Sequence, residues 1–208
     1  MLDTQARPAK REIWALVVLD ASLRYADVLR NGIGPGALSV MLDRTADGLS
    51  QVARAVGGRK RLSSLTIVSH GVPGGLDLGQ TRLDTAGVLQ NGAAMLAAIG
   101  ASLAPNGLLQ LVACDVAHGP DGAMFLQALA NAIGRPVCAS TRPLNAGPIS
   151  TGWELDAWAS PHGGAAPRAA TVPIAPSARA AYAQALSGSI TAGTASTAVN
   201  VGYLLLQA

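Results

Sequence analysis

Four short apolar runs constrain the fold of this chain more than any other feature of its sequence. They contain mostly Val, Ile, Leu and Ala and cover residues 13–20, 37–43, 65–69 and 108–114. Runs this short, bounded by polar residues or glycine, are typical of buried strands and too brief for buried helices. We therefore expect four internal strands, with a fifth over 137–140 and a sixth at a sheet edge over 152–158.

The segments between these runs carry helical patterns. Helices are expected over 23–30, 47–56, 85–103 and 121–133. Three of them are followed by Gly32, Gly57 or Gly134, and glycine readily ends a helix because it tolerates the left-handed conformation. The alternation of strand and helix predicts an α/β fold with a mostly parallel, doubly wound sheet. After the third strand, the alternating residues 74–83 predict a small hairpin that turns near Gly79 and Gln80.

Composition divides the chain into two parts. Half of the residues are hydrophobic, but only 3% are aromatic and 24 are glycine, which suits one domain of closely packed helices and strands. This α/β domain is expected over 12–158. Residues 159–208 are rich in Pro, Gly and Ala at first and in Ser, Thr and Ala later, which predicts a linker followed by a loosely ordered or truncated tail.

Charge and cysteine content exclude several classes of function. Charged residues make up 13% of the chain and the net charge is +3; the short basic clusters lack interleaved aromatic residues, so we expect no nucleic-acid partner. No apolar run is long enough to insert in a membrane, and the N-terminus lacks the residue order of a secretory signal. The two cysteines allow one disulfide, so the cysteine content does not decide the redox compartment.

Two strand ends carry residues with catalytic chemistry. The run LTIVS leads to His70 and Gly71, and the run LLQLVA leads to Cys114. If these strands are neighbours in the sheet, their ends lie about 5 Å apart, at the edge where parallel sheets place their active sites. An imidazole can generate a cysteine thiolate and then protonate a leaving amine. The backbone N–H groups of Gly71 and Cys114 are then candidate donors to an oxyanion.

Other polar residues near these strand ends have weaker assignments. Asp20 ends the first strand and is expected either to orient His70 or to cap a helix. Asp115 is a candidate for attracting a basic substrate side chain, although an acid beside Cys114 also raises the thiol pKa. Cys138, inside the fifth strand, is expected in the core. Cys114, His118 and His70 are a minimal ligand set for zinc, which takes four protein ligands or three and a water. We expect no metal and no cofactor.

The order of these motifs resembles the caspase-like cysteine peptidases, among them caspases, gingipains, legumain, clostripain and separase. The matching features are SHGVPGGLDLG at 69–79, LVACDVAHG at 111–119, and the later Ala-Ser-Thr and Trp-Glu-Leu segments. Over about 13–158 the pattern is most similar to a bacterial domain of unknown function, found near the N-terminus of large surface proteins and adhesins with cadherin-like or RTX-type repeats. The spacing of 44 residues from His70 to Cys114 is close to that of caspases.

The resemblance implies a caspase-like three-layer sandwich and a cysteine endopeptidase. In it His70 would be the general acid/base, Cys114 the nucleophile, and the Gly71 and Cys114 amides the oxyanion donors. A peptide or protein, with the parent chain itself as one candidate, would be the substrate. The resemblance also implies an exported or cell-surface protein, whereas the N-terminus leaves a cytoplasmic one open. The alternative is a catalytically silent structural or presentation module at the N-terminus of such a protein.

Overall fold

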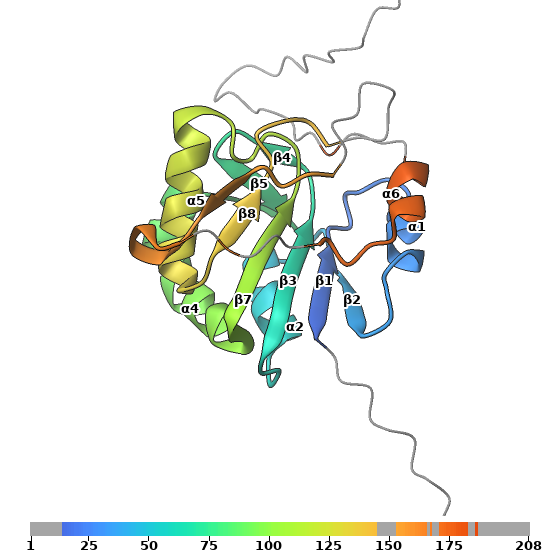
Figure 1. Ribbon diagram of the computed structural model, residues 1–208, viewed down its shortest axis with the longest axis horizontal. Coiled ribbons are helices and arrows are strands. Elements are labelled where there is room, and N and C mark those ends of the chain that lie inside the picture. The colour runs from blue at the N-terminus through green and yellow to red at the C-terminus, as the bar shows by residue number, and fades with distance from the viewer. Residues whose placement is uncertain (1–13, 145–152, 166, 168–170, 183–185, 187–208) are drawn as a thin grey trace, which may run out of the picture.

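A six-stranded sheet runs through the centre of the molecule (Figure 1). The structure is a computed structural model and describes residues 14–144, 153–165, 167, 171–182 and 186. The sheet order is β2-β1-β3-β7-β8-β9, in which the strands are β1 Ala15–Leu19, β2 Ala37–Met41, β3 Leu62–Val68, β7 Leu103–Val112, β8 Val137–Ala139 and β9 Ala157–Ala159. All neighbours pair in parallel except β8 and β9. The predicted mostly parallel α/β sheet is therefore confirmed.

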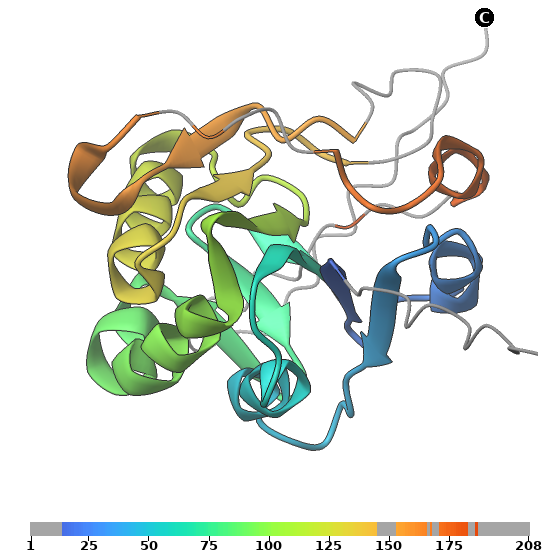
Figure 2. The same ribbon diagram turned by 60° about the horizontal axis from the view of Figure 1, so that its bottom comes forward.

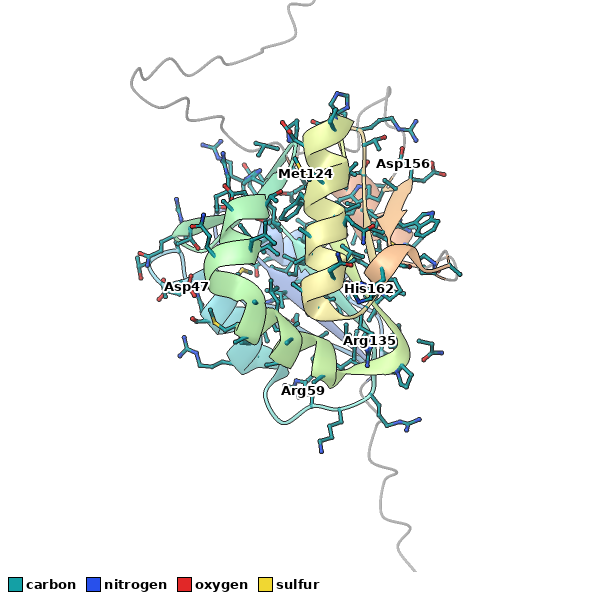
Figure 3. The ribbon with its side chains drawn as sticks, turned by 90° about the vertical axis from the view of Figure 1, so that its left-hand side faces the viewer. Asp47, Arg59, Met124, Arg135, Asp156 and His162 are labelled. Atoms are coloured by element: carbon teal, nitrogen blue, oxygen red, sulfur yellow. The ribbon has the colours of Figure 1, made fainter. Side chains whose placement is uncertain are left out.

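One face of the sheet is covered by α2 (Gly48–Val56), α4 (Ala93–Ser102) and α5 (Gly119–Ile133). Figure 3 shows α4 and α5 side by side on this face, with Met124 near the start of α5 and Arg135 just beyond its end. Alternate strand residues point into this layer because side chains of a strand alternate between its faces. They include Leu16, Val18, Leu65, Ile67, Leu109 and Leu111.

The opposite face is covered by α1 (Ala26–Asn31) and α6 (Pro176–Ala181), which pack against each other. Figure 2 shows these two helices together, on the other side of the sheet from α2 and α4. The remaining strand residues form a second buried cluster with this layer. Its strand members are Val17, Leu19, Val68 and Val112, followed in the chain by Cys114.

A three-stranded antiparallel sheet follows β3 and is formed by β4 (Gly71–Val72), β5 (Gly75–Leu78) and β6 (Thr81–Asp84). The turn between β5 and β6 is at Gly79 and Gln80, as predicted. Its tip is tied to the main sheet, because Gly79 donates its N–H to the Asp20 carboxylate at 2.7 Å and Gln80 donates to the Ala46 carbonyl at 3.1 Å.

The long helix predicted over 85–103 and the edge strand predicted over 152–158 differ from the observed elements. The single helix predicted over 85–103 is three consecutive helical segments, α3 (Thr85–Gly87), the π-helix η1 (Val88–Gly92) and α4. The Asp84 carboxylate accepts the Gly87 N–H and so caps the first short helix, α3. At the other end, β7 begins at Leu103, directly after α4. The edge strand predicted over 152–158 is the shorter β9, and residue 152 lies outside the described residues.

Part of the segment predicted as linker and tail is packed on the second cluster. Val172, Ile174, Tyr182 and Leu186 are each no more than 4% exposed and belong to this cluster. Residues 187–208 and residues 12 and 13 lie outside the described residues. Among the helices that the structure describes, none has the length and hydrophobicity needed to cross a bilayer.

Candidate active site at the ends of strands β3 and β7

Strands β3 and β7 are neighbours, and they bring His70 and Cys114 to the same edge of the sheet. Their parallel register pairs Val68 with Val112, and His70 and Cys114 each lie two residues beyond this pair. Two residues earlier in the same register, the Thr66 hydroxyl donates a buried hydrogen bond of 2.8 Å to the Gln110 side chain. This bond helps to hold the register of the two strands. Figure 1 shows these strand ends pointing toward β4 and β5.

In the chain, His70 lies between β3 and β4, the first strand of the three-stranded antiparallel sheet. Its carbonyl accepts the Asp77 N–H of β5 at 2.9 Å, and the preceding Ser69 hydroxyl donates to the Asp77 carbonyl. The ring is half-buried, and its Nδ1 is buried without a hydrogen-bond partner among the described residues. Two contacts with one residue of β5 thus hold the backbone around His70, while one ring nitrogen is left without a described partner.

Cys114 is fully buried in the second cluster. Its Sγ accepts the Leu144 N–H at 3.0 Å and lies 3.5 Å from the Leu144 carbonyl oxygen. Tyr182 is also close: burial, and secondarily the charge of Cys114, raise the pKa of the Tyr182 hydroxyl to about 12. The Tyr182 hydroxyl is therefore neutral at physiological pH beside this thiol.

The backbone N–H groups of Gly71 and Cys114 converge on a single oxygen atom. Both donate to the carbonyl of Leu186, at 2.9 Å and 3.0 Å. The Leu186 N–H in turn donates to the Leu144 carbonyl at 3.4 Å, and the Leu186 side chain is completely buried. Two amides aimed at one carbonyl oxygen form the geometry that stabilises a developing oxyanion in acyl transfer.

Gly71 can make this contact only because it has no side chain. A Cβ at this position would overlap the Cys114 carbonyl oxygen and come within 2.7 Å of Val116 Cγ2 and 2.8 Å of Ala113 Cβ. The backbone after β3 therefore approaches the backbone after β7 closely. This approach sets the two N–H groups side by side.

The two predicted acidic residues lie in different environments. Asp20 is fully buried, and its carboxylate accepts the N–H groups of Ser22 and Gly79, so it joins the end of β1 to the hairpin tip. Asp115 has left-handed backbone with φ 59°. Burial raises the pKa of its carboxyl group, and the nearby His118 opposes this shift.

The other candidate ligands and thiols are separate from Cys114. His118 is exposed, and its Nδ1 lies 3.1 Å from the Thr141 carbonyl oxygen. Cys138 lies in β8 and is 7% exposed; burial raises its thiol pKa to about 11. Within the described ranges, no three His, Cys, Asp or Glu residues are grouped as a metal ion would require.

Leu144 and Leu186 are parts of this site that the sequence pattern did not indicate. Leu186 follows Cys114 by 72 residues and lies in a segment whose composition suggested a tail. Leu144 lies in the loop after β8, near prolines, and no motif surrounds it. Only the aliphatic character of Leu186, in a chain stretch otherwise rich in Ala, Ser and Gly, distinguishes it in the sequence.

Comparison with known proteins gave a family match over most of the chain. The model of the family described as "Domain of unknown function (DUF4347)" matches residues 16–186. No curated protein matches the chain. Among solved structures, a crystal structure of a small-chain dehydrogenase aligns with a TM-score of 0.31 and 10% identity, over 58% of this chain and 75% of that protein. A likeness this low carries no functional argument.

Proposed function

The chain belongs to the family of domains of unknown function DUF4347, and we propose that it is a caspase-like cysteine endopeptidase with a His70 and Cys114 dyad. The observation that carries this proposal is the convergence of the Gly71 and Cys114 amides on one carbonyl oxygen. In enzymes of acyl transfer, backbone N–H groups, among them that of the nucleophilic residue, donate hydrogen bonds to the oxygen of the acyl group.

Each residue has a distinct task in the proposed reaction. His70 takes the Cys114 thiol proton, and the thiolate attacks the peptide carbonyl carbon. The negative charge that develops on the carbonyl oxygen is held by the Gly71 and Cys114 N–H groups. The His70 imidazolium then protonates the leaving amine, and a water molecule hydrolyses the thioester with His70 as base.

Three neighbouring residues support this arrangement. Asp77 binds the His70 backbone, and Leu144 binds Cys114 Sγ through its N–H. Asp20 joins β1 to the hairpin that follows His70. In this proposal Asp20 is a positioning residue that acts through the hairpin, and Asp115 borders the site without taking part in bond breaking.

The context of the proposed enzyme rests on the motif resemblance. We propose that the domain is part of an exported or surface-associated bacterial protein and that its substrates are polypeptides, its own parent chain included. No nucleic-acid partner, membrane insertion or cofactor is needed for this chemistry.

Covalent labelling tests the dyad. Because Leu186 occupies the Gly71 and Cys114 amides, the Leu186→Asp variant is treated with an acyloxymethyl-ketone peptide, and the labelled cysteine is located by mass spectrometry. We expect Cys114 to label at least about 10-fold faster than Cys138, whose pKa of about 11 keeps it protonated. Adding His70→Ala should remove this advantage, whereas the surface variant His162→Ala should keep it. Equal labelling of both cysteines in a folded protein would contradict the proposal.

A catalytically silent module is the second candidate, and one observation favours it. Cys114 has no exposed surface, and Leu186 occupies both amides, so the site is filled by the chain itself. In a silent module this contact would serve only to join the C-terminal segment to the sheet. The same labelling experiment separates the two candidates, because a structural thiol would gain no reactivity from His70.

A further inference from the structure

Leu186 is bound in the way that the acyl residue of a substrate is bound. We propose that the Leu186–Ser187 peptide bond is the bond that this site cleaves, so that the domain processes its own chain and selects an aliphatic residue before the cut. This inference rests on the proposed peptidase function and adds the substrate, the bond and the specificity.

Both backbone groups of Leu186 are held, each by a different part of the site. Its carbonyl oxygen accepts from Gly71 and Cys114, and its N–H donates to the Leu144 carbonyl. Leu144 also donates its own N–H to Cys114 Sγ, so a single residue contacts both the nucleophile and the candidate substrate. Both backbone groups of Leu186 are thus fixed beside the Cys114 backbone and thiol.

The Cys114 backbone N–H joins the nucleophilic residue to the Leu186 carbonyl. The Cys114 N–H is bound to the Leu186 oxygen, and Sγ is only three bonds from that nitrogen. Rotation about χ1 of Cys114 moves Sγ between the staggered positions around this backbone. In the proposed reaction, one of these positions brings Sγ to the Leu186 carbonyl carbon, which is one bond from the bound oxygen.

The side chain of Leu186 explains the expected selectivity. It is completely buried in the second cluster, whose other members include Trp153, Tyr182 and Val172. Burial of a leucine side chain is favourable, whereas an unpaired charge in the same place is strongly disfavoured. The pocket therefore favours leucine or methionine over acidic or basic residues at this position.

The covalent steps balance without any co-reactant except water. Cys114 Sγ forms a bond to the Leu186 carbonyl carbon, and the bond from that carbon to the Ser187 nitrogen breaks. The Ser187 nitrogen receives the proton that His70 took from Cys114 and becomes the new N-terminus of residues 187–208. Water then releases the Leu186 carboxylate and restores the thiol.

Intact-mass spectrometry of the full chain during incubation in reducing buffer tests this inference. We expect two products, residues 1–186 and 187–208, formed at a rate that does not change on dilution because the reaction is intramolecular. Cys114→Ala should abolish the cut and His70→Ala should slow it by about 100-fold or more. The matched control Cys138→Ala should cleave normally.

Substitution of Leu186 tests the specificity. Leu186→Met should still be cleaved, whereas Leu186→Asp should be cleaved about 100-fold more slowly, in line with the discrimination that an apolar pocket provides. Absence of the cut in a wild-type protein whose Leu186→Asp form labels at Cys114 would overturn the inference and leave the peptidase standing. A cut at another bond would overturn it equally. Absence of both cut and labelling would overturn both proposals.

Discussion

Gly71 shows how one missing side chain determines the geometry of the candidate site. Its N–H and the Cys114 N–H reach the same oxygen because the two backbones approach more closely than a β-carbon allows. The sequence predicted the Gly71 N–H as an oxyanion donor, but not the close approach of the two backbones. The structure adds the contacts that a side chain here would disturb, which are Cys114, Val116 and Ala113.

Gly71→Ala is therefore expected to separate the two strand ends. Overpacking of this kind costs about 1–3 kcal/mol of unfolding free energy, measurable by urea denaturation. The same variant should lose the cleavage after Leu186, since one oxyanion donor moves away. Gly34→Ala is the matched control, because nothing lies within 4 Å of a Cβ there and its stability should be unchanged. Equal stability of the two variants would contradict this account of Gly71.

At the scale of elements, the hairpin β5–β6 is joined to the main sheet by Asp20. This buried carboxylate accepts the Gly79 N–H at 2.7 Å and the Ser22 N–H at 2.8 Å. The sequence left open whether Asp20 orients His70 or caps a helix. The hydrogen bonds show that it links the end of β1 with the hairpin tip, and no described bond joins its carboxylate to His70.

Asp20→Asn should loosen the hairpin. The amide group can accept through one oxygen only, so one of the two N–H donors loses its partner, at a cost of about 1–3 kcal/mol. Hydrogen exchange should speed up over residues 75–84, most of all at Gly79. Asp77→Asn is the control in the same hairpin, because its part-exposed pair with Arg82 contributes about 0–1 kcal/mol. Unchanged exchange at Gly79 would argue against the role of Asp20.

Helix α2 begins with a pH-dependent cap. Asp47 accepts the Ser50 N–H at 2.8 Å, and its hydrogen bonds to Ser50 lower the pKa of its carboxyl group from the ordinary value of 3.8. Since the pKa is lower in the folded state, the cap stabilises the protein above pH 3.8 and this contribution is lost as the pH falls through the folded pKa.

Asp47→Ala should lower the unfolding free energy by about 0.5–2 kcal/mol at neutral pH. The difference from the wild type should shrink as the pH is lowered below 4, as followed by thermal unfolding at several pH values. Asp47→Ser keeps an N-cap oxygen that does not titrate in this range, and should retain most of the stability throughout. A difference that persists at pH 2 would assign the effect to packing instead of the carboxylate.

At the scale of the whole molecule, the second cluster is completed by residues far along the chain. Val172, Ile174, Tyr182 and Leu186 pack on the face of the sheet that carries Val17, Val68 and Cys114. The same face supports α1, which contacts α6. The core of the described chain thus extends beyond residue 158, the boundary that composition indicated. The family match ends at residue 186, which is also the last residue of this cluster.

Two truncated chains test this extent. A chain that ends at residue 158 should expose the second cluster, bind a hydrophobic dye and unfold at a lower temperature, because four buried apolar side chains are lost at about 1.5–3 kcal/mol each. A chain that ends at residue 186 keeps all of these contacts and should match the full chain in melting temperature within about 2 °C. Equal melting of the two truncated chains would show that the later segment adds no stability.

The sequence by itself determined the elements and the chemistry of the strand ends. Apolar runs and glycine stops are local signals, so the parallel sheet, the hairpin turn at Gly79 and the candidate pair His70 and Cys114 could be read directly. Only the tertiary structure decided what lies against that pair. Leu186 carries no motif, and its place on the Gly71 and Cys114 amides depends on a buried cluster formed by segments far apart in the chain. Such a contact is made by backbone groups, which nearly all residues share, and by the packing of one aliphatic side chain, so it leaves no distinct motif in the sequence.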